Sequence, residues 1–252
     1  MGGEHRIYGR LQAIMHLVAT SLIVLVAMVL LYRLLVDVGR GATAAPARAG
    51  TAAGRPAPPL PQEPVSLEGA ALRGSTTARV ALIEYLDVQC PYCAAFVRET
   101  LPALEEQYIR PGKILFAIRH FPLRSIHPFA AKSAEAAECA GDHGKFWEMH
   151  DAMFANPKLL DEPNLRAQAA RLGLDGAAFS TCLAGARSKD VEADEVSGRR
   201  LGVTGTPTFF LGVVNADRRV KVVERFSGAR SIEQFRRSID RVLTDALALQ
   251  TR

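Results

Sequence analysis

Residues 80–86 form a nearly continuous apolar run, which is typical of a strand covered on both faces of a sheet. Apolar side chains then recur every three to four positions from Pro91 to Tyr108, which predicts a helix that Pro102 kinks. A second strand is predicted at 113–121. This succession of strand, helix and strand predicts an α/β fold.

The second half of the chain begins with helical patterns and ends with strands. An alanine-rich helix is predicted to open at His127-Pro128. The later predicted elements are helices at 162–172, 176–185 and 188–201, strands at 207–213 and 219–225, and a last helix. Ser231 and Gln234 form a capping box at the start of that last helix. The predicted order is therefore β, α, β, a helical block, β, β and α.

The N-terminal region has a different composition. Residues 11–32 contain no Asp, Glu, Lys or Arg, and a helix of this length spans roughly 33 Å, enough to cross a bilayer. We therefore predict a transmembrane signal-anchor at 11–36 after a short cytoplasmic tail at 1–10. A cleaved signal peptide with a cleavage region at 42–47 is the alternative, although its apolar segment normally has only about 7–15 residues. Residues 37–64 are rich in Pro, Ala and Gly and predict an extended linker.

Charge and length restrict the remaining part of the chain. The formal net charge of the 252 residues is +5, and no stripe of basic and aromatic residues runs along any predicted element. Such a stripe is typical of nucleic-acid binding, so we predict no nucleic-acid partner. Residues 65–252 are long enough for one hydrophobic core and are predicted to form a single domain.

Two cysteines follow the first apolar strand directly. The motif Cys90-Pro91-Tyr92-Cys93 stands where strand passes into helix, and its spacing lets a disulfide open and close with little backbone movement. The positive end of the helix dipole stabilises a thiolate at Cys90, and Pro91 suits the first helical position. We therefore predict that Cys90 is the nucleophile of a redox site and that Cys93, on the buried face, is the resolving thiol.

A zinc site is the alternative use of this motif. Cys139 and His143 could supply the other two ligands. The two halves are separated by roughly 45 residues, which is long for a small zinc module. We therefore predict a redox site without a metal, and no other cofactor.

Glu84 interrupts the apolar strand six residues before Cys90. Burying an ionised carboxylate costs several kcal/mol, so a buried Glu84 has a raised pKa and can exchange protons with Cys93. The alternative is that Glu84 lies at a solvent-exposed edge.

A further signal lies far downstream at Thr206-Pro207, between a turn that contains glycine and a β-rich apolar run. A cis X-Pro bond is compatible with this position, although only a small minority of such bonds are cis. The combination of Glu84, the Cys-Pro-Tyr-Cys motif, this proline and the stretch 136–150 resembles the DsbA-like branch of the thioredoxin superfamily. The resemblance extends over roughly residues 65 to 250.

The resemblance implies a thioredoxin fold with a helical insertion at about 126–203, which catalyses dithiol–disulfide exchange. It also implies that Pro91, Tyr92, Thr206 and Pro207 border the active disulfide and hold the client chain. Tyr92 stands where the best-known oxidase of this family has histidine, and this central dipeptide tunes the reduction potential. Nothing in the N-terminal region resembles the dimerisation domain of the related isomerases, which favours an oxidase.

Cys139 and Cys182 lie in the predicted helical block. In an oxidising compartment an even number of cysteines favours pairing, so we predict a structural disulfide between them. Two buried free thiols that act as small hydrophobic residues are the alternative.

These observations predict a membrane-anchored oxidase that introduces disulfides into exported proteins. Because a disulfide catalyst requires an oxidising compartment, its catalytic domain is expected on the extracytoplasmic side. Its clients would be exported proteins that contain cysteines, and the resemblance implies a quinone-linked redox partner in the membrane. The alternatives are a reductase or isomerase of the same fold, and a tethered module that binds a metal or clients without catalysis.

Overall fold

The computed structural model describes residues 25–33 and 59–248. The chain divides into two compact units, Met1–Ala57 and Pro58–Arg252. In the first unit, residues 25–33 form a helix with exposed side chains.

The predicted tail at 1–10 lies outside the described residues. The predicted span at 11–36 and linker at 37–64 also lie mostly outside them, so these predictions are not tested. Within the two described ranges, no helix combines the length and the apolar character needed to cross a bilayer.

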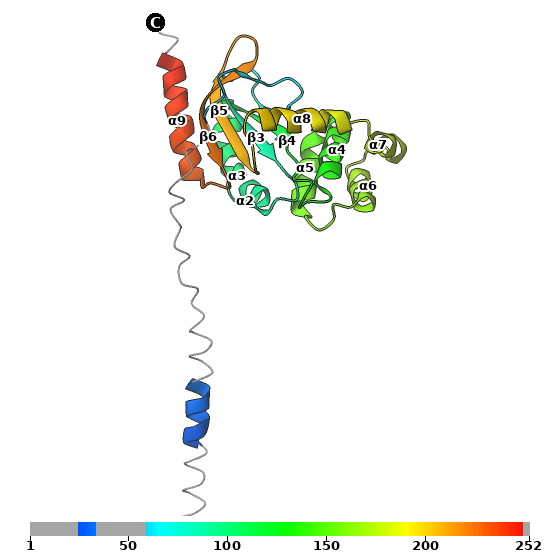
Figure 1. Ribbon diagram of the computed structural model, residues 1–252, viewed down its shortest axis with the longest axis vertical. Coiled ribbons are helices and arrows are strands. Elements are labelled where there is room, and N and C mark those ends of the chain that lie inside the picture. Colours follow the sequence, from blue (N-terminus) through cyan, green and yellow to red (C-terminus); the bar gives the residue numbers. More distant parts are fainter. Residues whose placement is uncertain (1–24, 34–58, 249–252) are drawn as a thin grey trace, which may run out of the picture. The chain divides into compact units, whose positions relative to one another are not determined.

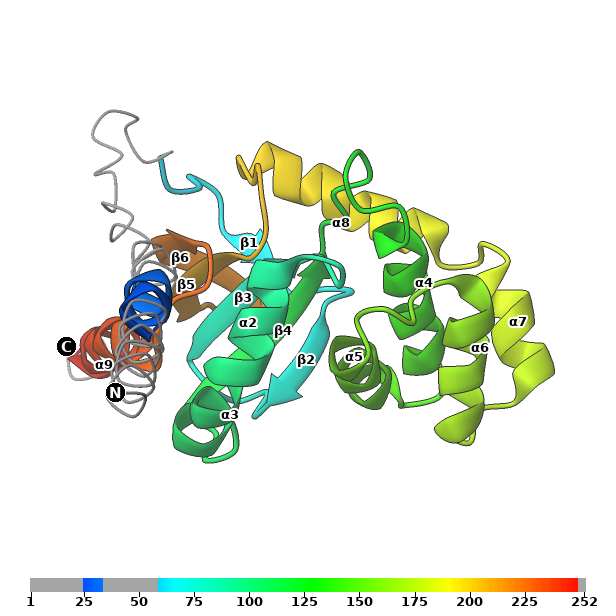
Figure 2. The same cartoon turned by 90° about the horizontal axis from the view of Figure 1, so that it is seen from below.

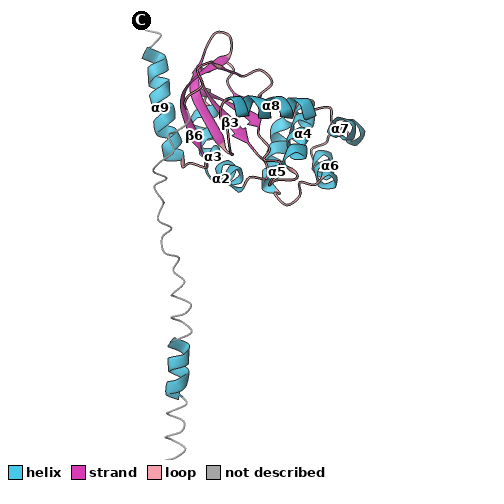
Figure 3. Ribbon diagram, in the orientation of Figure 1, coloured by secondary structure: helices cyan, strands magenta, loops and turns pink. Residues whose placement is uncertain are grey.

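Within residues 59–248, six strands form one sheet in the order β1-β6-β5-β3-β4-β2. Figures 1 and 3 show this sheet between α9 and the helices α4 to α7. The strands are β1 (Val65–Ser66), β2 (Ala71–Gly74), β3 (Val80–Leu86), β4 (Ile114–His120), β5 (Thr208–Val214) and β6 (Arg219–Ser227). β3 is central: it runs parallel to β4 and antiparallel to β5. All its residues are buried, which confirms the prediction of a strand covered on both faces.

The helices of the second unit fall into two groups. They are α2 (Pro91–Glu99), α3 (Leu101–Leu104), a π-helical turn η1 (Glu105–Ile109), α4 (Ala130–Gly141), α5 (Phe146–Ala155), α6 (Glu162–Arg171), α7 (Gly176–Leu183), α8 (Ser188–Arg200) and α9 (Ile232–Ala248). Helices α4 to α7 gather beside the sheet, and α8 runs from them back along it (Figure 2). Because α4 to α8 lie between β4 and β5 in the chain, they form a helical insertion in an α/β fold of the thioredoxin type.

The helical segment predicted from Pro91 to Tyr108 is confirmed, and it is interrupted at Thr100, two residues before the predicted kink at Pro102. α2 ends at Glu99, and the chain continues as two separate turns. Pro102 has no N–H group to continue the helical hydrogen bonds. At the interruption, the Thr100 hydroxyl donates to the Arg230 carbonyl oxygen at 2.8 Å.

The alanine-rich helix also begins later than predicted. α4 starts at Ala130, and His127 lies in the turn before it, where its carbonyl oxygen accepts from the Ala130 N–H group at 3.2 Å. The loop at 121–129 therefore connects β4 to the helical insertion.

Both faces of the sheet are packed against helices. On one face, the ring of Phe96 in α2 lies 4.7 Å from Phe209 in β5 and 5.6 Å from Phe235 in α9. On the other face, Gly198 in α8 packs so closely that a Cβ atom there would lie 2.6 Å from the ring of Phe121. These contacts fix α2 and α8 on opposite faces of the central strands.

Candidate active site

Cys90 and Cys93 lie at the start of α2, directly after the central strand. Cys90 is the N-cap residue and Pro91 follows at the first helical position, as the sequence predicts. Both cysteines are free thiols. Cys90 is 3% exposed and Cys93 is fully buried, so solvent reaches this pair of residues only at Cys90.

The surroundings of Cys90 stabilise its thiolate. A hydrogen bond from the Cys93 thiol is the largest contribution, and smaller ones come from Thr206 and from the backbone N–H groups of Cys93 and Tyr92. These donors outweigh the effect of burial and lower the pKa of Cys90 to about 5. An unperturbed thiol has a pKa of about 8.5, so Cys90 is a thiolate at neutral pH.

Cys93 has the opposite character. Burial is the main cause that raises the pKa of this thiol, followed by the hydrogen bond to Cys90 and the negative charge of Glu84. Cys93 therefore keeps its proton while Cys90 is ionised. This asymmetry lets one sulfur attack or leave while the other acts as a proton donor.

The Glu84 carboxyl group lies in an apolar environment. The side chain is fully buried, and neither carboxyl oxygen has a hydrogen-bond partner among the described residues. Its neighbours across the sheet are Ile118 in β4 and Phe209 in β5. Burial, with a smaller contribution from Cys90, raises the pKa of Glu84. The alternative of a solvent-exposed edge position is therefore wrong.

The loop before β5 covers the reactive sulfur. The Thr206-Pro207 peptide bond is cis, and the Thr206 carbonyl oxygen lies 3.3 Å from the Cys90 Sγ atom. The Thr206 hydroxyl is buried without another described partner. Tyr92, by contrast, is 63% exposed beside the two cysteines. The structure thus brings Thr206 and Pro207 to the motif, as the resemblance implies, and leaves the Tyr92 ring in solvent.

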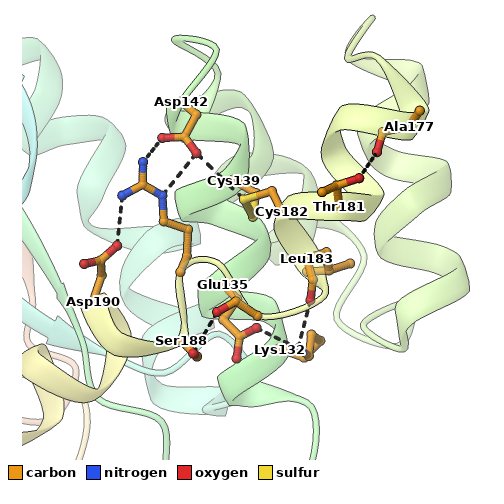
Figure 4. Close-up of a disulfide and its surroundings, with 12 residues drawn as sticks. Lys132, Glu135, Cys139, Asp142, Ala177, Thr181, Cys182, Leu183, Ser188 and Asp190 are labelled. Carbon is orange, nitrogen blue, oxygen red and sulfur yellow. Dashed lines mark hydrogen bonds and ion pairs between the residues drawn. A yellow bond between two sulfur atoms is a disulfide. The ribbon is translucent and has the colours of Figure 1, made fainter.

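Cys139 and Cys182 are joined by a disulfide between α4 and α7, with their Cα atoms 5.8 Å apart. Figure 4 shows Asp142 beside this bond, with one carboxyl oxygen 3.7 Å from the Cys182 sulfur. The same carboxylate accepts hydrogen bonds from Arg187. Because Cys139 is bonded to Cys182, it is not a free thiolate ligand for the zinc site considered above.

Asp87, for which the sequence predicts no role, also lies at the site. Its side chain is fully buried between β3 and Cys90, and its carboxylate accepts hydrogen bonds from Gln89, Leu123 and His127. The sequence signal was an acidic residue at the end of an apolar strand, directly before the cysteine motif. Such a residue is equally common in exposed turns, so its burial becomes evident only in the fold.

Comparison with known proteins identifies the family. Residues 66–241 match the thioredoxin family. The chain therefore belongs to the thioredoxin family.

Solved structures with the same fold include several disulfide-exchange proteins. Alpha-DsbA1 from Wolbachia pipientis superposes with a TM-score of 0.65 and 27% identity, over 74% of this chain and 96% of that one. Oxidised BdbD from Bacillus subtilis superposes with a TM-score of 0.60, over 73% of this chain and 98% of that one. Its identity of 18% indicates a shared fold alone. This chain shares the fold of these proteins and carries the Cys-Pro-Tyr-Cys motif at the start of α2.

Curated relatives in sequence are much longer proteins. The Na(+)/H(+) antiporter NhaA 1 of Salinispora arenicola is 42% identical over 149 residues, which are 59% of this chain and 22% of the antiporter. The antiporter NhaA of Herminiimonas arsenicoxydans is 33% identical over 156 residues, which are 61% of this chain and 24% of that protein. The chain thus spans about a quarter or less of the length of these relatives.

Proposed function

We propose that this protein is a membrane-anchored disulfide oxidase that passes the Cys90–Cys93 disulfide to exported proteins. One observation carries the proposal: a thiolate-stabilised Cys90 lies beside a buried, protonated Cys93. Stabilising the thiolate favours the reduced enzyme over its disulfide, and this makes the disulfide a strong oxidant.

The proposed reaction exchanges one disulfide for another. A client thiolate attacks the Cys90 sulfur, a mixed disulfide forms, and Cys93 leaves and takes up a proton. The second client thiolate then attacks the client sulfur of the mixed disulfide and releases the Cys90 thiolate. The client gains one disulfide, and the enzyme gains two electrons at its cysteine pair. Glu84 is the proposed proton relay for Cys93, because both groups are buried, the charge of Glu84 raises the pKa of Cys93, and no described residue hydrogen-bonds to the Glu84 carboxyl group.

We further propose that residues 11–36 anchor the protein, that the catalytic unit faces the cell envelope and that a quinone-linked membrane partner removes the two electrons. The apolar sequence at 11–32 supports the anchor. The curated relatives support a membrane setting as well, because they are antiporters in which a similar module is part of a longer chain.

Two measurements test the direction and the class of the reaction. In growing cells trapped by acid and then alkylated, an oxidase should hold Cys90 and Cys93 mostly as a disulfide. A mostly reduced pair would instead support a reductase or isomerase. Insulin disulfide exchange by the purified domain should be unaffected by a chelator, whereas a module that only binds a metal or clients would show no exchange.

A further inference from the structure

Residues 86–89, which connect β3 to Cys90, form hydrogen bonds with the loop at 121–129. The Phe121 N–H group donates to the Leu86 carbonyl oxygen at 2.7 Å. The Phe129 N–H group donates to the Gln89 side-chain oxygen at 2.5 Å. The loop therefore contacts the residues on both sides of Asp87.

The carboxylate of Asp87 lies at the centre of this contact. Its Oδ1 atom accepts from the Gln89 N–H group at 2.7 Å, and its Oδ2 atom accepts from the Leu123 N–H group at 2.7 Å. The Oδ2 atom also lies 2.8 Å from Nδ1 of His127. Because a carboxylate only accepts hydrogen bonds, Nδ1 of His127 is the donor in this last bond.

His127 supplies the only side-chain donor among these three described bonds. Its side chain is 16% exposed, whereas that of Asp87 is fully buried. A buried carboxylate that loses one of its donors is costly and rearranges to recover it. The backbone around Asp87 would then move.

Movement of Asp87 would reach both sulfur atoms. The Cys90 N–H group donates to the Asp87 carbonyl oxygen at 3.0 Å. The Asp87 backbone also stabilises the thiolate form of Cys93, although burial dominates the pKa of that residue and raises it. The geometry of both cysteines thus depends on where Asp87 is held.

We propose that His127 is a positioning residue of the redox site, which acts through Asp87 to hold the segment before Cys90 against the entrance of the helical insertion. The proposal deepens the thiol–disulfide exchange function proposed above and rests on it. In this proposal, the loop at 121–129 controls the position of the Cys90 thiol through the hydrogen bond between His127 and Asp87, which lie 40 residues apart in sequence.

Two variants that place an amide N–H group differently test this coupling. In His127→Asn the amide nitrogen takes the place of Nδ1, and in His127→Gln it takes the place of Nε2. We expect His127→Asn to keep the thiolate-to-thiol ratio of Cys90 at pH 6 within twofold of the wild type, measured by absorbance at 240 nm. We expect His127→Gln and His127→Ala to lower this ratio at least tenfold. His143→Ala, in an exposed loop, is the matched control and should change nothing.

Equal thiolate-to-thiol ratios in all variants would overturn the proposal, as would equal losses in His127→Asn and His127→Ala.

A measurement on the wild type remains decisive if a variant does not fold. With ¹⁵N-labelled histidine at one fixed pH, the ring resonances of His127 should differ between the disulfide and dithiol forms of the Cys90–Cys93 pair, while those of His143 stay constant. Unchanged His127 resonances would also overturn the proposal. None of these measurements needs a client, so failure of insulin exchange by the wild type would instead count against the proposed function.

Discussion

The thiol of Cys90 loses its proton at a lower pH than an ordinary thiol. Hydrogen bonds from Cys93, Thr206 and the start of α2 lower its pKa to about 5. Iodoacetamide alkylation of the reduced protein should therefore have its midpoint near pH 5. A midpoint at or above the ordinary value of about 8.5 would contradict the stabilised thiolate. A Cys93→Ala variant is the matched control, and its midpoint should rise because the largest donor is gone.

The same shift makes the stability of the reduced protein depend on pH. The pKa of Cys90 is lower in the folded protein than in the unfolded chain, so the Cys90 thiolate raises the free energy of unfolding. This stabilisation is complete above about pH 8.5 and is lost as the pH falls towards 5. At pH 7 the contribution is roughly 2–3 kcal/mol. Urea unfolding of the reduced wild type and of Cys90→Ala at pH 5 and pH 7 measures it, and a stability difference that does not change with pH would contradict it.

The buried carboxyl group of Glu84 affects both stability and exchange. Replacing its unpartnered carboxyl group with an apolar side chain in Glu84→Leu should stabilise the fold by about 1–3 kcal/mol. The same change should slow release of the mixed disulfide at least tenfold, because the proton relay to Cys93 is lost. Stopped-flow exchange with a cysteine peptide and urea unfolding measure the two effects.

The matched control for Glu84 is Glu84→Gln, which keeps the shape and polarity of the side chain but cannot transfer a proton. It should slow release like Glu84→Leu without the gain in stability. Unchanged release in both variants would mean that Glu84 has no part in the exchange.

Between elements, the disulfide joins α4 to α7 across 43 residues of sequence. Removing it in the double variant Cys139→Ala/Cys182→Ala should lower the free energy of unfolding by roughly 2–4 kcal/mol, mainly because the unfolded chain becomes less restricted. The free energy of unfolding should also fall more steeply with urea concentration in this variant, because its unfolded state is more expanded. Peptide mapping that finds two free thiols in protein purified from the cell envelope would contradict the pairing.

For the whole molecule, Cys93→Ala tests the proposed mechanism and location together. Without Cys93, the mixed disulfide between Cys90 and a client has no intramolecular route of release and should accumulate. Non-reducing gels of cells, with mass spectrometry of the reducible bands, should find exported proteins that contain cysteines. Bands present in Cys90→Ala and absent from Cys93→Ala would reverse the two roles, and a set of cytoplasmic proteins would contradict the proposed location.

Local sequence was sufficient to predict the start of the site. The apolar run of β3, the cysteine spacing and Pro91 act within a single strand-to-helix junction, so their consequences do not depend on the rest of the chain. The same holds for the order of the main elements, because the length of each apolar run, its spacing and its flanking Gly and Pro residues distinguish strands from helices locally. Pro102 likewise predicted a break in the helix that begins at Pro91, whereas the hydrogen bond from Thr100 to Arg230 at this break depends on the tertiary structure.

Tertiary structure alone decided which distant groups surround the reactive sulfur. Thr206 lies 116 residues from Cys90 in sequence, and His127 lies 40 residues from Asp87. The apolar neighbours that leave the Glu84 carboxyl without a partner come from β4 and β5. A pKa depends on these neighbours and on burial, whereas sequence spacing reports neither. The sequence therefore determined that a reactive cysteine pair opens α2, and the folded sheet determined which groups set its proton chemistry.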